Sequence, residues 1–144
     1  QVVYADKITA PSASRLYSIK RTRVNAYCSS LGKCILANYS NSELENIMKD
    51  CSFIKFTPNT ISDMEQLRTE LAKVRKQGWA MEDEEYETGQ RCIGAPVYDY
   101  KGDIVAAISA SGEKHVLTDD RINEVADYLV KKAFELSKTL GYVE

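Results

Sequence analysis

The sequence predicts an α+β domain, with an antiparallel sheet and helices packed against it. Three strand patterns, at residues 79–86, 91–98 and 103–111, follow one another through short turns. Parallel neighbours need long crossover connections, so these strands are expected to pair antiparallel. Helical patterns lie on both sides of this run, and 144 residues fit one domain. The chain shows no internal repeat.

The first half is expected to begin with strands and continue with helices. β-branched and aromatic residues favour strands near the start. Ser29 or Ser30 can cap the first helix, whose inner face would carry Leu31, Cys34 and Ile35. The elements expected here are strands at Val2–Ile8 and Ser14–Ile19, helices at about 30–38 and Ser42–Lys49, and a short strand at Phe53–Phe56.

The second half carries sharper boundary signals. Ser62 and Glu65 fit a capping box, from which a helix is expected to run to a stop at Gly78. The three strands follow, the last two joined by a hairpin turn at Asp99–Gly102. Thr118 is expected to cap a final helix that Gly141 closes.

Composition excludes several classes of protein. Nineteen basic and 21 acidic residues give a formal charge of −2, without the basic excess of a nucleic-acid-binding surface. No apolar run reaches the length of about 18 residues that a membrane span needs. The four cysteines form no Cys-x-x-Cys pair and there is one histidine, so neither a structural metal nor a cofactor is expected. The abrupt start in a strand pattern suggests a piece of a longer chain.

One face of the second hairpin gathers small polar groups. Side chains alternate along a strand, so Ser109 and Ser111 share a face, and so do Cys92 and Gly94. A simple turn places Cys92 opposite Ser109 or Ser111. Two interpretations are open: a polar patch that binds a ligand, or small residues packed under a helix and bonded to the backbone.

Two further segments carry groups that can bind polar ligands. The helix start at Cys28–Lys33 has unpaired N–H groups, although ordinary capping explains its serines equally well. The acidic run from Glu82 to Glu85 is expected to point one carboxylate inward, for a ligand hydroxyl or for Arg91. A catalytic cysteine would need a base, and His115 lies in an apparent surface loop.

Four segments together resemble the IclR family of bacterial transcriptional regulators. They are Ser30–Ala37, Leu71–Ala80, Asp83–Val97 and Ala106–Gly112, in the family's order and spacing. The resemblance implies the C-terminal effector-binding domain, over residues 1–144, with a GAF-like curved antiparallel sheet flanked by helices. It also implies an N-terminal winged helix-turn-helix domain outside this chain, a cytoplasmic location, and a homodimer or homotetramer.

The resemblance also implies a site. Its backbone donors fall at Ser30 and Leu31, its acid at Glu82 with Asp83 adjacent, its thiol at Cys92, its hydroxyls at Ser109 and Ser111, and an apolar wall position at Leu16. The ligand would be a small organic acid that changes operator binding, and the regulator a repressor of catabolic genes. Segments at 15–18 and 27–28 are similar to regulators that sense sugar acids.

The expected function is therefore sensing, without enzymatic activity. Two alternatives stay open. A GAF-type enzyme with a pocket cysteine, similar to a methionine-sulfoxide reductase, predicts turnover that depends on Cys92. A purely oligomerising module predicts no stabilisation by any small molecule.

Overall fold

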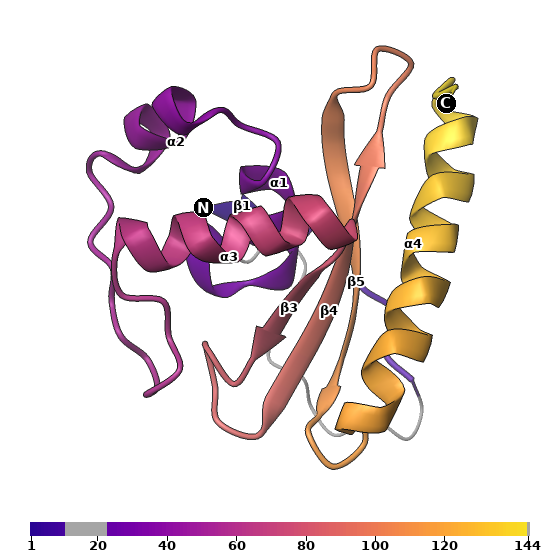
Figure 1. Ribbon diagram of the computed structural model, residues 1–144. Helices are drawn as coiled ribbons and strands as arrows, with labels where there is room; N and C mark the ends of the chain where they lie inside the picture. The colour runs from indigo at the N-terminus through magenta and orange to yellow at the C-terminus, as the bar shows by residue number, and fades with distance from the viewer. Residues whose placement is uncertain (11–22, 144) are drawn as a thin grey trace.

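A three-stranded antiparallel sheet is the centre of the protein (Figure 1). The computed structural model describes residues 1–10 and 23–143. The expected α+β class is confirmed. The elements in order are β1 (Val2–Val3), β2 (Arg23–Val24), the 3-10 turn η1 (Ala26–Cys28), α1 (Ser30–Leu36), α2 (Asn41–Met48), α3 (Met64–Gln77), β3 (Ala80–Asp83), β4 (Gln90–Tyr98), β5 (Ile104–Glu113), the 3-10 turn η2 (Asp119–Arg121) and α4 (Ile122–Thr139).

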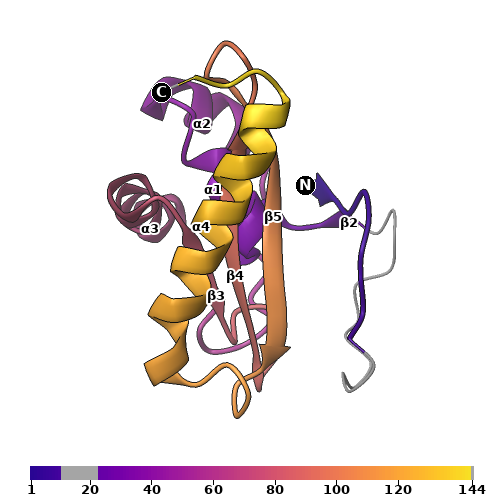
Figure 2. The ribbon, with the colours of Figure 1, turned by 90° about the vertical axis from the view of Figure 1, so that its right-hand side faces the viewer.

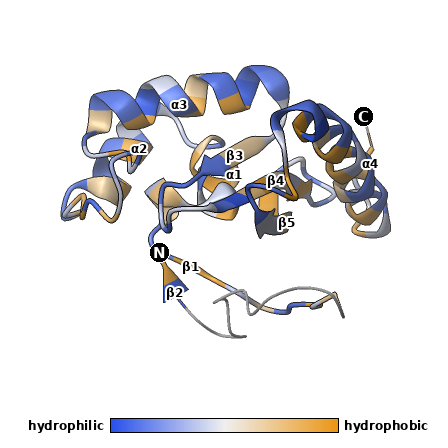
Figure 3. Ribbon diagram, turned by 90° about the horizontal axis from the view of Figure 1, so that it is seen from below, coloured by the Kyte–Doolittle hydropathy of each residue, from blue (hydrophilic) through white to orange (hydrophobic). Residues whose placement is uncertain are grey.

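Helices cover the sheet on its two faces. The sheet has the order β3-β4-β5, and α1 and α4 contact β4 from opposite sides (Figures 1 and 2). Helix α3 and the β1–β2 pair lie on opposite sides of α1 (Figure 3). No helix within the described residues is both long and apolar enough to cross a membrane.

Alternation along β4 sends two kinds of residue to these two faces. The face toward α4 is apolar: Ile93, Ala95 and Val97 are fully buried and pack with α4 residues Ala126, Leu129 and Ala133. The face toward α1 carries Cys92 and Gly94. A side chain at Gly94 would place its Cβ 3.0 Å from the backbone carbon of Ser30, so the glycine lets α1 lie directly on the sheet.

Several expected boundaries are confirmed. Ser29 caps α1, accepting a hydrogen bond from the Gly32 N–H at 3.1 Å. Gly78 ends α3 in the left-handed conformation, with φ of 79°. The strands at 90–98 and 104–113 pair as expected, and Gly102 lies in the turn between them with φ of 84°. Gly141 follows α4 with φ of 85°.

Other expectations were wrong. The capping box of Ser62 and Glu65 does not form: Asp63 caps α3 by accepting from the Gln66 N–H, and Ser62 lies outside the helix. Thr118 does not cap α4, since the turn η2 intervenes. The segment 53–56 forms no strand, and the first strand is only Val2–Val3. The expected strand Ser14–Ile19 lies outside the described residues.

Candidate functional site

The polar groups of the α1 face lie in rows across the sheet. Glu82 of β3 pairs with Cys92 of β4, which pairs with Ser111 of β5. In the next row Gly94 pairs with Ser109. Directly opposed residues of antiparallel strands project to the same face. The register therefore places Glu82, Cys92, Ser109 and Ser111 on the α1 face, where Glu82 is buried, Cys92 and Ser109 are half-buried and Ser111 is exposed. Cys92 lies opposite Ser111, one of the two expected partners.

Helix α1 brings its first turn to this face. The carbonyl of Ser30 lies 3.1 Å from the position that a Gly94 Cβ would take. The first N–H groups of a helix have no acceptor within it. Ser29 satisfies the Gly32 N–H, while the N–H groups of Ser30 and Leu31 have no partner within α1. Ser30 is buried and Leu31 is half-buried.

Glu82 is the inward carboxylate of the acidic run. It is 3% exposed, and its Oε1 accepts the backbone N–H groups of Glu85 and Tyr86 at 2.7 and 3.1 Å. Burial raises the pKa of Glu82, while these bonds and one to Cys92 oppose the rise. The carboxylate thus closes the turn after β3 as well as facing the row.

Asp83 is not brought to the other predicted residues. It pairs with Arg91, which follows the alternation to the α4 face, and accepts the Arg91 Nε–H at 2.7 Å. Arg91 is buried and also donates to the Leu117 carbonyl at 3.0 Å. The carboxylate that holds Arg91 is thus the partly exposed Asp83 and not the inward Glu82, and Arg91 ties the sheet to the loop before α4. Leu16 lies outside the described residues.

Cys92 is a protonated thiol in this setting. Burial raises its pKa most, and the nearby Glu82 carboxylate raises it further. Cys28, at the end of η1, is also buried, and its pKa is raised to about 12 by burial and by Glu85 and Glu82. Both thiols are therefore small, uncharged groups at neutral pH.

Tyr4 and an ion pair belong to the same region and were missed from the sequence. Burial, with smaller contributions from Cys92 and Glu82, raises the pKa of Tyr4 to about 12. Lys33 of α1 is fully buried, and its Nζ lies 2.5 Å from the Glu85 Oε1. A lysine between the apolar positions of α1 was the available signal for this pair.

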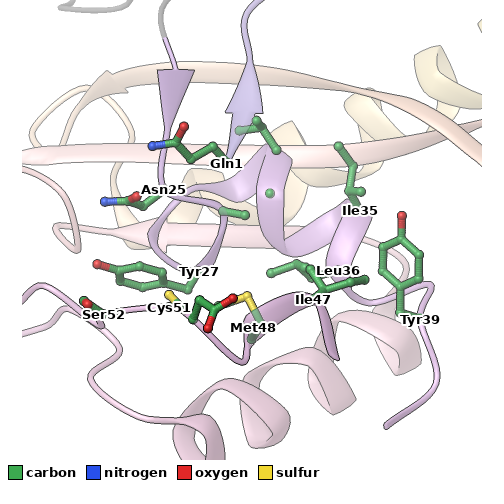
Figure 4. Close-up of a pocket in the computed structure, with 14 residues that line it drawn as sticks. Gln1, Asn25, Tyr27, Ile35, Leu36, Tyr39, Ile47, Met48, Cys51 and Ser52 are labelled. Carbon is green, nitrogen blue, oxygen red and sulfur yellow. The ribbon is translucent and has the colours of Figure 1, made fainter. Parts of the chain in front are cut away.

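A separate cavity lies between α1, α2 and the start of the chain (Figure 4). Its volume is about 460 Å³. Leu36, Ile47 and Met48 form an apolar side, while Gln1 and Asn25 lie toward the β1–β2 pair (Figure 4). None of the predicted site residues that the structure describes lines this cavity. Across residues 1–10 and 23–143, His, Cys, Asp and Glu form no cluster able to hold a metal ion.

Comparison with known proteins decides the family. Residues 1–138 match the family model described as Bacterial transcriptional regulator IclR C-terminal. The chain belongs to the IclR family. The chain corresponds to the C-terminal, effector-binding domain of such a regulator. Relatives carry this domain as part of a longer chain.

Relatives and solved structures agree with this assignment. The HTH-type regulators KdgR and XynR of Escherichia coli are 33% and 31% identical, over 98% and 97% of this chain. The match covers 54% of KdgR and 56% of XynR, so the chain spans about half their length. The crystal structure of Thermotoga maritima IclR is 38% identical over 97% of this chain and 57% of its own, with a TM-score of 0.91. The curated relatives are named as transcriptional regulators, not as enzymes.

Proposed function

We propose that this domain senses a small organic acid, a sugar acid or a keto acid, on the sheet face beside the first turn of α1, at the row of Glu82, Cys92 and Ser111. Binding would modulate the operator affinity of a repressor of catabolic genes, acting as a homodimer or homotetramer. DNA would be contacted by a winged helix-turn-helix domain, which we expect ahead of this one in the full regulator. The observation that carries the proposal is a row of polar groups that runs from the buried Glu82 to the exposed Ser111 beside a helix start, in a family of transcriptional regulators.

Each residue has a distinct role in this proposal. The N–H groups of Ser30 and Leu31 hold the ligand carboxylate, and Leu16 contributes an apolar wall. Glu82, Ser109 and Ser111 bond the hydroxyl or carbonyl groups of the ligand. The neutral thiol of Cys92 packs beside them without adding charge. Asp83 is left in its pair with Arg91 and contacts no ligand in the proposal.

The ligand can act on the domain through Glu82. This carboxylate already holds the N–H groups of Glu85 and Tyr86, so a ligand bonded to it changes the turn that joins β3 to β4. A ligand shifts a conformational equilibrium only by its difference in affinity between two states. Coupling of about 1–3 kcal/mol is typical of allosteric proteins and suffices for regulation.

The protonation of Cys92 favours binding over catalysis. A nucleophilic cysteine works as a thiolate, whereas burial and Glu82 hold Cys92 as a thiol. A methionine-sulfoxide-reductase-like activity therefore has weak support at this site. It predicts turnover of methionine sulfoxide that is lost on Cys92→Ser, and observing such turnover would replace the sensing proposal.

Thermal unfolding against a panel of acids tests the proposal. The panel contains keto acids, sugar acids, allantoin-type acids and aromatic acids. A ligand at a hundred times its Kd adds about 2.7 kcal/mol, a shift of a few degrees in Tm. We expect one class to give this shift, and Ser111→Ala to reduce it.

Ser52→Ala is the matched control, because it makes the same change in the cavity of Figure 4. We expect it to leave the shift intact. A shift abolished by Ser52→Ala and kept by Ser111→Ala would move the effector site to that cavity. No shift with any acid would favour the oligomerising module.

A further inference from the structure

Lys33 and Glu85 form a buried ion pair beside the candidate site. Lys33 is 0% exposed and Glu85 is 8% exposed, and the Lys33 Nζ lies 2.5 Å from the Glu85 Oε1. The Nζ is also 3.6 Å from Glu70 on α3. Removing two charges from water is expensive, and replacing such a pair by apolar residues is often neutral or stabilising. Stability alone therefore does not account for this pair.

The backbone fixes Glu85 next to Glu82. Glu84 has a φ of 55°, which turns the chain back directly after β3. The Glu85 N–H then donates to the Glu82 Oε1 at 2.7 Å, and the Thr60 hydroxyl donates to the Glu85 carbonyl at 2.6 Å. A non-glycine residue in the left-handed region costs free energy, so the surrounding contacts hold this turn in place.

The second oxygen of Glu85 has no partner. Its Oε2 is buried, and none of the described residues donates a hydrogen bond to it. Buried polar atoms are nearly always paired, because an unpaired one loses its hydration without compensation. The hydrogen bond from the Glu85 N–H to the Glu82 Oε1 places Glu85 directly beside the row, and both carboxylates also raise the pKa of the buried Cys28 thiol. The residue that carries the unpaired oxygen therefore adjoins the candidate site.

We propose that Glu85 determines ligand specificity, its Oε2 accepting a hydrogen bond from a hydroxyl group of the bound acid. The inference rests on the proposed function and deepens it. A carboxylate oxygen only accepts, so its partner must be a donor. The adjacent Lys33 ammonium repels a cationic donor, and a hydroxyl group is the neutral donor that the proposed sugar acid carries. Lys33 holds Oε1 and thereby orients Oε2. Hydroxylated acids are the preferred ligand class.

Calorimetric titration with two six-carbon acids tests this assignment. D-Gluconate carries hydroxyl groups on its chain, and hexanoate is its counterpart without them. The double variant Lys33→Met/Glu85→Leu removes the acceptor and both charges together, which avoids leaving either charge unpaired. We expect the preference for D-gluconate over hexanoate to fall at least tenfold, as expected when a hydrogen bond to a charged group is lost.

Two further variants complete the experiment. Glu70→Gln removes the other acid near Lys33 without touching Glu85 and should leave the preference as in the wild type. Glu85→Gln keeps the side-chain shape and replaces the charged acceptor, and an intermediate loss of preference is expected. This single variant serves as the measurement if the double variant does not fold.

Every outcome bears on the inference. An unchanged preference in both Glu85 variants, while the wild type binds D-gluconate, overturns it and leaves the proposed function intact. Equal weakening of both acids also overturns it, because the pair would then support the site only structurally. Absence of binding of either acid to the wild type, with no shift across the acid panel, overturns the proposed function and this inference together.

Discussion

The two faces of the sheet differ in what they bury. Toward α4, Ile93, Ala95 and Val97 pack in an apolar cluster with Ala126, Leu129 and Ala133. Toward α1, the same strand contributes Cys92 to a cluster that includes Glu82, and β5 adds hydroxyl groups. Both faces belong to one sheet of three strands. The difference therefore lies in which side chains the strand alternation directs to the α1 face and which to the α4 face.

The physical cost of the two faces is also different. Apolar burial stabilises a protein by roughly 25 cal/mol for each Å² removed from water. Buried carboxylates and an ion pair cost free energy unless every group is satisfied, and the Glu85 Oε2 is not. One face therefore stabilises the domain, while the other gives up stability for a polar site. Proteins accept such a cost where function requires it.

The largest expected effect comes from breaking the ion pair of the α1 face. Lys33→Ala leaves the Glu85 carboxylate buried without its partner, and we expect the free energy of unfolding to fall by about 4 kcal/mol. Lys73→Ala is the matched control, because Lys73 pairs with Glu70 at the surface and is expected to cost less than about 1 kcal/mol. Urea unfolding measures both. A similar small loss in the two variants would show that the buried pair is not electrostatically coupled.

A smaller loss is expected from the apolar face. Leu129→Ala opens a cavity between α4 and the sheet and should lower the free energy of unfolding by about 3 kcal/mol. The affinity of the α1 face for its ligand should stay the same in folded protein. Leu136→Ala makes the same change where the side chain is 41% exposed, and we expect a loss below about 1 kcal/mol. A large change in ligand affinity in Leu129→Ala would contradict the separation of the two faces.

The apolar face and the register were predictable from the sequence. Period-two alternation in residues 91–98 and the short turn at Asp99–Gly102 determine which residues meet across the hairpin, and Ser111 lies opposite Cys92 as one of two expected partners. The glycine stop at residue 78 has a local cause, and the structure confirms it. Such features depend on a few neighbouring residues.

The errors have tertiary causes. Asp63, not Ser62, caps α3; both residue types can accept from a backbone N–H, so the sequence pattern did not distinguish them. The sequence of the acidic run, Glu82 to Glu85, did not show which of its carboxylates point into the protein and which point outward. The positive φ of Glu84 ends the strand alternation and brings Glu85 beside Glu82, while Asp83 turns to Arg91. The Lys33–Glu85 pair joins residues 52 positions apart, which no local pattern can indicate.

The smallest expected effect has the opposite sign and comes from Glu82. Burial raises its pKa above the ordinary value of 4.5, so the folded protein binds the proton more tightly than the unfolded chain. The free energy of unfolding therefore decreases as pH rises from 4.5 through the raised value in the folded protein. Glu82→Gln removes this contribution and keeps an oxygen for the N–H groups of Glu85 and Tyr86. We expect a gain of about 1 kcal/mol at neutral pH and weaker ligand binding.

Glu43→Gln provides the contrasting control for this measurement. Hydrogen bonds from Ser40 lower the pKa of Glu43, so its contribution to stability is present above its ordinary pKa and is lost as pH falls. Glu43→Gln should therefore lower stability at neutral pH, whereas Glu82→Gln raises it. Urea unfolding at a series of pH values measures both. If the free energy of unfolding depends on pH in the same way in wild type and Glu82→Gln, burial of Glu82 does not destabilise the protein. The α1 face would then cost no more stability than the α4 face.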